Sequence, residues 1–63
     1  GYYYIYVDGA YVESVSCNGQ RVSVSRTSAG AYDYAYSVYM GSGCKYEISI
    51  SSNGSSTTIM INK

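Results

Sequence analysis

The chain has 63 residues, ten of them tyrosine, and it contains no histidine, proline, phenylalanine or tryptophan. Four basic and four acidic side chains give a formal net charge of zero, which excludes the strongly basic surface that binds nucleic acid or an anionic membrane. No apolar run reaches the roughly 18 residues of a membrane-spanning helix, and no basic segment precedes an apolar core. We therefore expect a mature product with a single domain over residues 1–63, no nucleic-acid partner and no membrane insertion.

Alternation with a period of two dominates the chain, and β-branched and aromatic residues fill the alternating segments. This pattern predicts an all-β protein of about six strands, over residues 2–7, 10–17, 20–26, 31–40, 44–51 and 56–62. The dipeptides Asp8-Gly9, Asn18-Gly19 and Asn53-Gly54 lie between strands. Because such dipeptides readily adopt the positive φ angles of two-residue hairpin turns, each is expected to join two antiparallel neighbours.

The first expected strand, residues 2–7, is apolar at every position. Because side chains along a strand alternate between its faces, a hairpin turn after this strand would place its even-numbered residues on the core face, namely Tyr2, Tyr4 and Tyr6. The odd-numbered residues would then share the outer face with Val12 of the second strand. An exposed apolar patch is typical of an interaction site, and the expected subunit interface consists of Tyr3, Ile5, Val7 and Val12.

The two cysteines can crosslink the chain, and there is no histidine to complete a zinc site with them. In the expected registers Cys17 lies on the core face of the first three strands, and Cys44 lies on the core face of the last three. We therefore expect a disulfide between two packed sheets, which would stabilise the domain by about 3–4 kcal/mol. Since disulfides persist in oxidising compartments, an extracellular, secreted or cell-surface location is expected.

Together these registers predict a small, disulfide-stapled antiparallel β-sandwich of two three-stranded meanders. A Greek-key exchange of edge strands between the sheets, or a barrel-like closure, is the alternative. Glu13 breaks the pattern, because it takes a core position between Tyr4 and Val24, where an unpaired carboxylate is costly. A β-bulge at Glu13, or a place at the sheet margin near Arg26, would account for it.

The chain offers little for catalysis. General acid-base chemistry usually relies on histidine or paired carboxylates, and this chain has no histidine and only four acidic residues. We expect no enzymatic activity, no cofactor and no metal site.

Two functions fit these features. The first is a structural subunit of an extracellular filament or surface layer, a homo-oligomer or homopolymer that assembles through the apolar N-terminal strand 2–7, either packed on or shared with a neighbouring subunit. The alternative is a secreted, tyrosine-rich module that binds glycans or a protein, with ligand-stacking residues Tyr3, Tyr11 and Tyr39. A small secreted toxin or inhibitor is a third, less favoured function.

Overall fold

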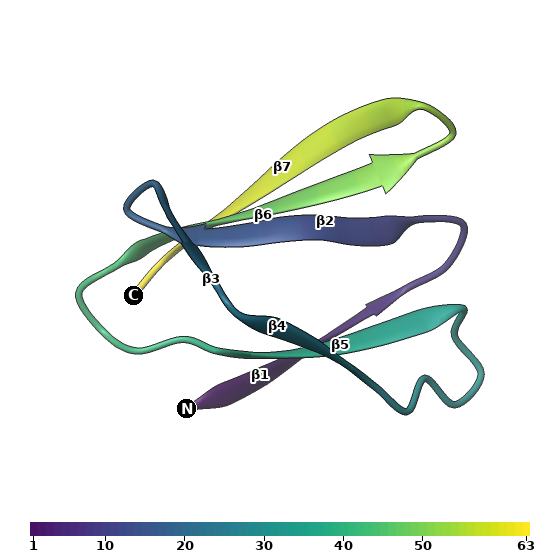
Figure 1. The fold of residues 1–63 in the computed structure, drawn as a ribbon, viewed down its shortest axis with the longest axis horizontal. Coiled ribbons are helices and arrows are strands. Elements are labelled where there is room, and N and C mark those ends of the chain that lie inside the picture. The colour runs from purple at the N-terminus through teal and green to yellow at the C-terminus, as the bar shows by residue number, and fades with distance from the viewer.

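The computed structural model describes residues 1–63 and consists of seven β-strands without a helix. The strands are β1 (Tyr2–Val7), β2 (Tyr11–Cys17), β3 (Gln20–Val22), β4 (Val24–Thr27), β5 (Tyr34–Tyr39), β6 (Lys45–Ser52) and β7 (Ser55–Asn62). They form a three-stranded sheet of order β1-β5-β4 and a four-stranded sheet of order β3-β2-β6-β7. The sheets lie as two layers (Figure 1), so the predicted all-β sandwich is confirmed.

The place of β1 differs from the prediction. This strand pairs with β5 along its whole length and not with β2. The expected hairpin at Asp8-Gly9 does not form. Only Gly9 of this pair has a positive φ, of 63°, whereas a type I′ turn needs positive φ at both central residues. The chain instead crosses from one sheet to the other over residues 8–10 (Figure 1).

The expected third strand, residues 20–26, also divides between the sheets. It breaks at Ser23, so that β3 stays beside β2 while β4 pairs with β5. The prediction of two separate three-stranded meanders is therefore wrong. The chain adopts the alternative, in which edge strands are exchanged between the sheets as in a Greek key, and the sandwich does not close into a barrel.

The two Asn-Gly turns form as predicted. Asn18 and Asn53 are the non-glycine residues with positive φ, of 49° and 51°, and each is followed by a glycine that also has positive φ. These turns fix the hairpin registers in which Val15 lies opposite Val22 and Ile48 lies opposite Ile59. The local turn chemistry thus determines both hairpins of the four-stranded sheet.

The core lies between the sheets and is centred on five buried side chains, Val15, Val38, Met40, Tyr46 and Ile48. The expected strands 31–40 and 44–51, which carry four of these residues, were assigned to one sheet, but β5 and β6 belong to different sheets. These residues therefore meet across the sandwich.

The two faces of β1 are the reverse of the prediction. Tyr2, Tyr4 and Tyr6 are 69%, 59% and 49% exposed, whereas Val7 is buried and Ile5 packs against the core. The reversal has a simple cause. Because β1 joins the opposite layer, the side of the strand that would have faced outward now faces the core.

A β-bulge corrects the expected position of Glu13. The register between β2 and β6 shifts between Val12 and Ser14, so Val12 packs against the core and Glu13 is exposed. The Glu13 carboxylate accepts hydrogen bonds from the hydroxyls of Ser49 at 3.0 Å and Ser56 at 3.2 Å. The predicted bulge is confirmed, while the expected outward direction of Val12 is wrong for the same reason.

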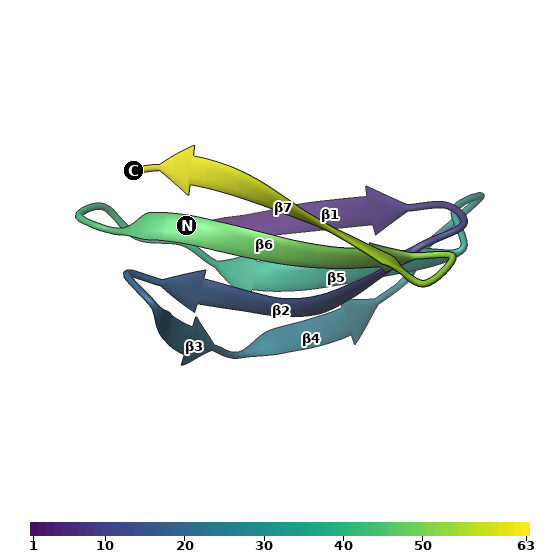
Figure 2. The same cartoon turned by 90° about the horizontal axis from the view of Figure 1, so that it is seen from above.

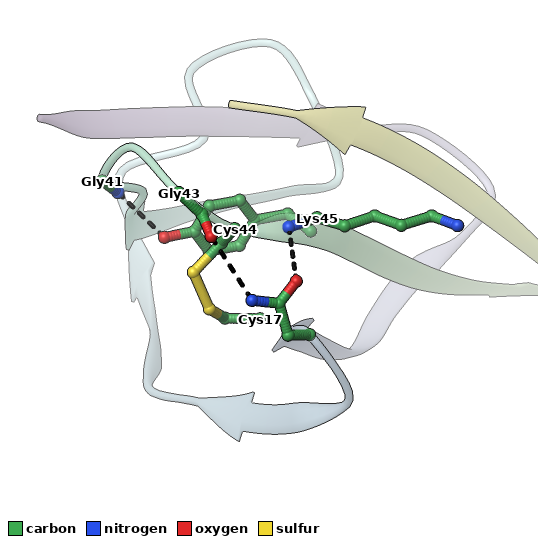
Figure 3. The surroundings of a disulfide bond; sticks show 7 residues. Cys17, Gly41, Gly43, Cys44 and Lys45 are labelled. Carbon is green, nitrogen blue, oxygen red and sulfur yellow. Dashed lines mark hydrogen bonds between the residues drawn. A yellow bond between two sulfur atoms is a disulfide. The ribbon is translucent and has the colours of Figure 1, made fainter.

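The predicted disulfide between Cys17 and Cys44 is present, with 5.3 Å between the two Cα atoms (Figure 3). It does not bridge the two sheets as expected. Cys17 ends β2, and Cys44 lies just before β6, which is the neighbour of β2 in the same sheet. The bond therefore fastens the connection over residues 40–44, where the chain passes from β5 in one sheet to β6 in the other.

Hydrogen bonds from Asn18 hold this connection beside the disulfide. The side chain of Asn18 accepts from the backbone N–H of Lys45 at 2.9 Å and donates to the carbonyl of Gly43 at 3.4 Å (Figure 3). The Tyr46 hydroxyl accepts from the backbone N–H of Gly41 at 2.8 Å.

Both chain ends are tied to the same connection. The backbone of Gly1 exchanges two hydrogen bonds with Met40, and the backbone of Lys63 bonds to Gly43 and Cys44. The N- and C-termini therefore lie at one end of a molecule that measures 32 × 24 × 15 Å (Figure 1).

Candidate functional surfaces

The outer side of the three-stranded sheet carries a surface that we call the tyrosine face, formed by Tyr2, Tyr4, Tyr6, Tyr32 and Tyr39. The rings of Tyr2 and Tyr39 pack edge to face with centroids 5.6 Å apart, and those of Tyr6 and Tyr32 pack at 5.1 Å. Directly beside Tyr4 and Tyr6 on β5 lie the small residues Ser37 and Ala35, which leave the rings standing above the sheet. The result is a broad aromatic surface that ends in hydroxyl groups.

Two edge strands lie along one side of the sandwich, which we call the long-stranded flank. They are β1, of six residues, and β7, of eight (Figure 2). β7 carries no proline and no charged residue, and its Ile59 and Met60 are 45% and 54% exposed. Where the flank meets the termini, the Lys63 ammonium lies 4.2 Å from the ring centroid of Tyr3 and contacts its hydroxyl.

The opposite side of the sandwich differs. Its edge strands are β3 and β4, of only three and four residues, with a break between them at Ser23 (Figure 2). Very short and bent edge strands give an incoming strand little backbone to pair with. The two sides of the sandwich therefore differ strongly in how readily they could extend the sheets.

A pocket of about 310 Å³ opens at the end of the sandwich away from the termini, and we call it the end pocket. Its lining residues belong to or adjoin the β1–β2 connection, the β4–β5 connection and the β6–β7 turn, which all lie at the end of the sandwich opposite the termini (Figure 1). Its lining residues are Gly9, Ala10, Tyr11, Asp33, Tyr34, Ser51, Ser52 and Asn53.

The residues expected to form a subunit interface occupy the inner side of their strands. Val7 is buried, Ile5 and Val12 pack against the core, and Tyr3 is 41% exposed. The outer face expected of them is occupied instead by the tyrosine face. Tyr3 alone of the four remains available, at the long-stranded flank.

The three expected ligand-stacking tyrosines are not brought together. Tyr3 lies at the long-stranded flank, Tyr39 on the tyrosine face and Tyr11 in the end pocket. Sequence reasoning also missed Tyr34, Asp33 and Asn53 as partners of Tyr11. The pairing of β2 with β6 and of β1 with β5 brings these residues together, and no local pattern in the sequence reports that.

Comparisons with known proteins identify no relative of this chain. No family model, curated protein or solved structure matches the chain. No helix capable of crossing a lipid bilayer is present.

Proposed function

We propose that this protein is a structural subunit of an extracellular filament or surface layer that assembles by pairing its edge strands. The observation that carries the proposal is the long-stranded flank, where β1 and β7 both end their sheets and neither strand contains a proline or a charged residue.

An edge strand presents unpaired backbone N–H and C=O groups, which can form hydrogen bonds with a strand from another chain. Natural sheets suppress such pairing with proline, charged residues, bulges or very short strands. The flank of β3 and β4 has two short strands, whereas β7 is eight residues long and carries exposed Ile59 and Met60. This difference favours the long-stranded flank as the side that meets another subunit.

The tyrosine face supplies a second surface for assembly. A single self-complementary contact between two copies closes into a dimer, so a filament needs a further contact. Edge pairing through the long-stranded flank and stacking through the tyrosine face would together link dimers into an open chain. The Cys17–Cys44 disulfide fits an oxidising, extracellular location for such an assembly.

Sedimentation velocity and negative-stain microscopy of the purified protein test this proposal. We expect the wild-type protein to form dimers and longer linear assemblies as its concentration rises. Ile59→Lys should prevent edge pairing, because a charge on β7 would have to be buried against the incoming strand. Since Ile59 is 45% exposed, the substitution should leave the monomer folded.

Ser23→Lys is the matched control, because it adds the same charge at the opposite, short-stranded flank. We expect this variant to assemble like the wild type. A wild-type protein that stays monomeric at every concentration, or equal loss of assembly in both variants, would contradict the proposal.

A further inference from the structure

The end pocket is lined by groups suited to an uncharged, hydroxyl-rich ligand. It holds two tyrosine rings, one carboxylate, one carboxamide and two serines, and none of its lining residues is a lysine or arginine. The absence of a cation in the lining disfavours phosphate or carboxylate ligands, which bind through charge-assisted hydrogen bonds. Its volume, about 310 Å³, lies at the lower end of the range for small-molecule sites, which begins at roughly 300 Å³.

Hydrogen bonds across the loops hold the pocket in shape. The Asp33 carboxylate accepts from the backbone N–H of Gly9 at 2.7 Å, and the Asp8 carboxylate accepts from the backbone N–H of Asp33 at 2.8 Å. The Ser52 hydroxyl donates to the carbonyl of Gly9 at 2.9 Å. These bonds join the three connections that form the pocket, so its walls are organised before any ligand arrives.

Tyr11 provides the surface on which a ligand would stack. Its ring is 50% exposed and takes part in none of the aromatic pairs of the structure. Tyr34 is more constrained, because the Arg26 guanidinium lies 4.5 Å from its ring centroid. Tyr11 therefore offers a free ring face, and Tyr34 forms a fixed wall.

We propose that the end pocket binds one pyranose ring of a neutral oligosaccharide. The apolar C–H face of the sugar would stack on Tyr11, while its hydroxyls would bond to the Asp33 carboxylate, the Asn53 carboxamide and the Ser51 hydroxyl. This function is independent of assembly, because the pocket lies among loops at one end of the sandwich and the proposed pairing uses strand edges.

Saturation-transfer difference NMR tests the proposal, since it detects protons of the bound sugar whether the protein is a monomer or an assembly. The probes are cellotetraose, chitotetraose, mannotetraose and maltotetraose, each measured separately with the full chain. Saturation of the tyrosine ring protons should transfer to the ring C–H protons of at least one probe.

Two variants locate the site. Tyr11→Ala should lower the affinity for that probe about tenfold or more, while Tyr11→Phe, which keeps the ring, should retain it. The control is Tyr39→Ala, which removes an exposed ring from the tyrosine face and should leave binding unchanged. The proposal is overturned if no probe receives saturation, or if binding is lost in Tyr39→Ala and kept in Tyr11→Ala.

Discussion

Two asparagines in this chain share an unusual backbone conformation but make different contacts. Asn18 and Asn53 both have positive φ, of 49° and 51°, in two-residue turns. The side chain of Asn18 also bonds to the backbone of Lys45 and Gly43, which lie in and beside the connection between the sheets. Asn53 has no such hydrogen bond to its side chain and lies at the rim of the end pocket.

This difference predicts unequal effects of two alanine substitutions. Both Asn18→Ala and Asn53→Ala force an alanine into the left-handed conformation, which costs about 1 kcal/mol. Asn18→Ala also removes two side-chain hydrogen bonds, so we expect it to lower the free energy of unfolding by about a further 1–2 kcal/mol. Chemical denaturation of the two variants, followed by circular dichroism, measures the difference. Equal losses would show that the side chain of Asn18 contributes no stability.

At the same scale, the sequence predicts which residues alternate but not which side faces the core. The alternation correctly divides the residues of β1 between its two faces, with Tyr4 on one face and Ile5 on the other. The assignment of the inner set depends on which sheet receives the strand, and both sets are apolar. In β2 the charged Glu13 gave a local signal of the bulge, so that deviation could be predicted.

At the scale of the elements, turns with two left-handed residues could be predicted and crossings between layers could not. An Asn-Gly hairpin depends on residues adjacent in sequence, and both examples form with the predicted register. The pairing of β1 with β5 joins residues more than 25 positions apart, and no nearby residue specifies it. The end pocket depends on this pairing and on the pairing of β2 with β6, which also joins residues distant in sequence, so its members were not predicted together.

The disulfide gives a prediction at this scale, because it fastens the connection from β5 to β6. The two cysteines are 27 positions apart, and a loop of that size corresponds to about 3–4 kcal/mol of stabilisation. We expect Cys17→Ala/Cys44→Ala to lose about this much free energy of unfolding. Guanidinium denaturation of the variant and the wild type measures it.

Reductant provides the control for that experiment. Dithiothreitol should destabilise the wild type toward the level of the double variant and should leave the variant unchanged. A double variant as stable as the oxidised wild type would show that the hydrogen bonds around residues 40–44 hold the connection alone.

For the whole molecule, the net charge and the uncharged residues of the proposed contact surfaces predict how assembly responds to salt. The net charge is zero, and neither β7 nor the tyrosine face contains an ionisable acid or base other than the tyrosine hydroxyls. We therefore expect assembly to persist as sodium chloride is raised from about 0.05 to about 1 M, where charge interactions are screened within about 3 Å. Sodium sulfate should strengthen assembly, because it favours apolar burial.

Sedimentation velocity across the salt series checks this prediction at constant protein concentration. Ser23→Lys again serves as a control, since an added charge away from the interface should not create strong salt dependence. Dissociation of the wild-type assembly by sodium chloride would indicate a contact between charged groups, such as Lys63 at the end of the flank, and not one through the uncharged residues of β1, β7 and the tyrosine face.

Because both chain termini lie at one end of the sandwich, attachment to a surface through either terminus gives the molecule the same orientation. Gly1 and Lys63 are both hydrogen-bonded to residues 40–44, and the connections that line the end pocket lie at the other end of the long axis (Figure 1). A linker that attaches either terminus to a surface would therefore place Tyr11 at the end of the molecule farthest from that surface. Immobilisation on a sensor chip through either end should leave the pocket open to the solution.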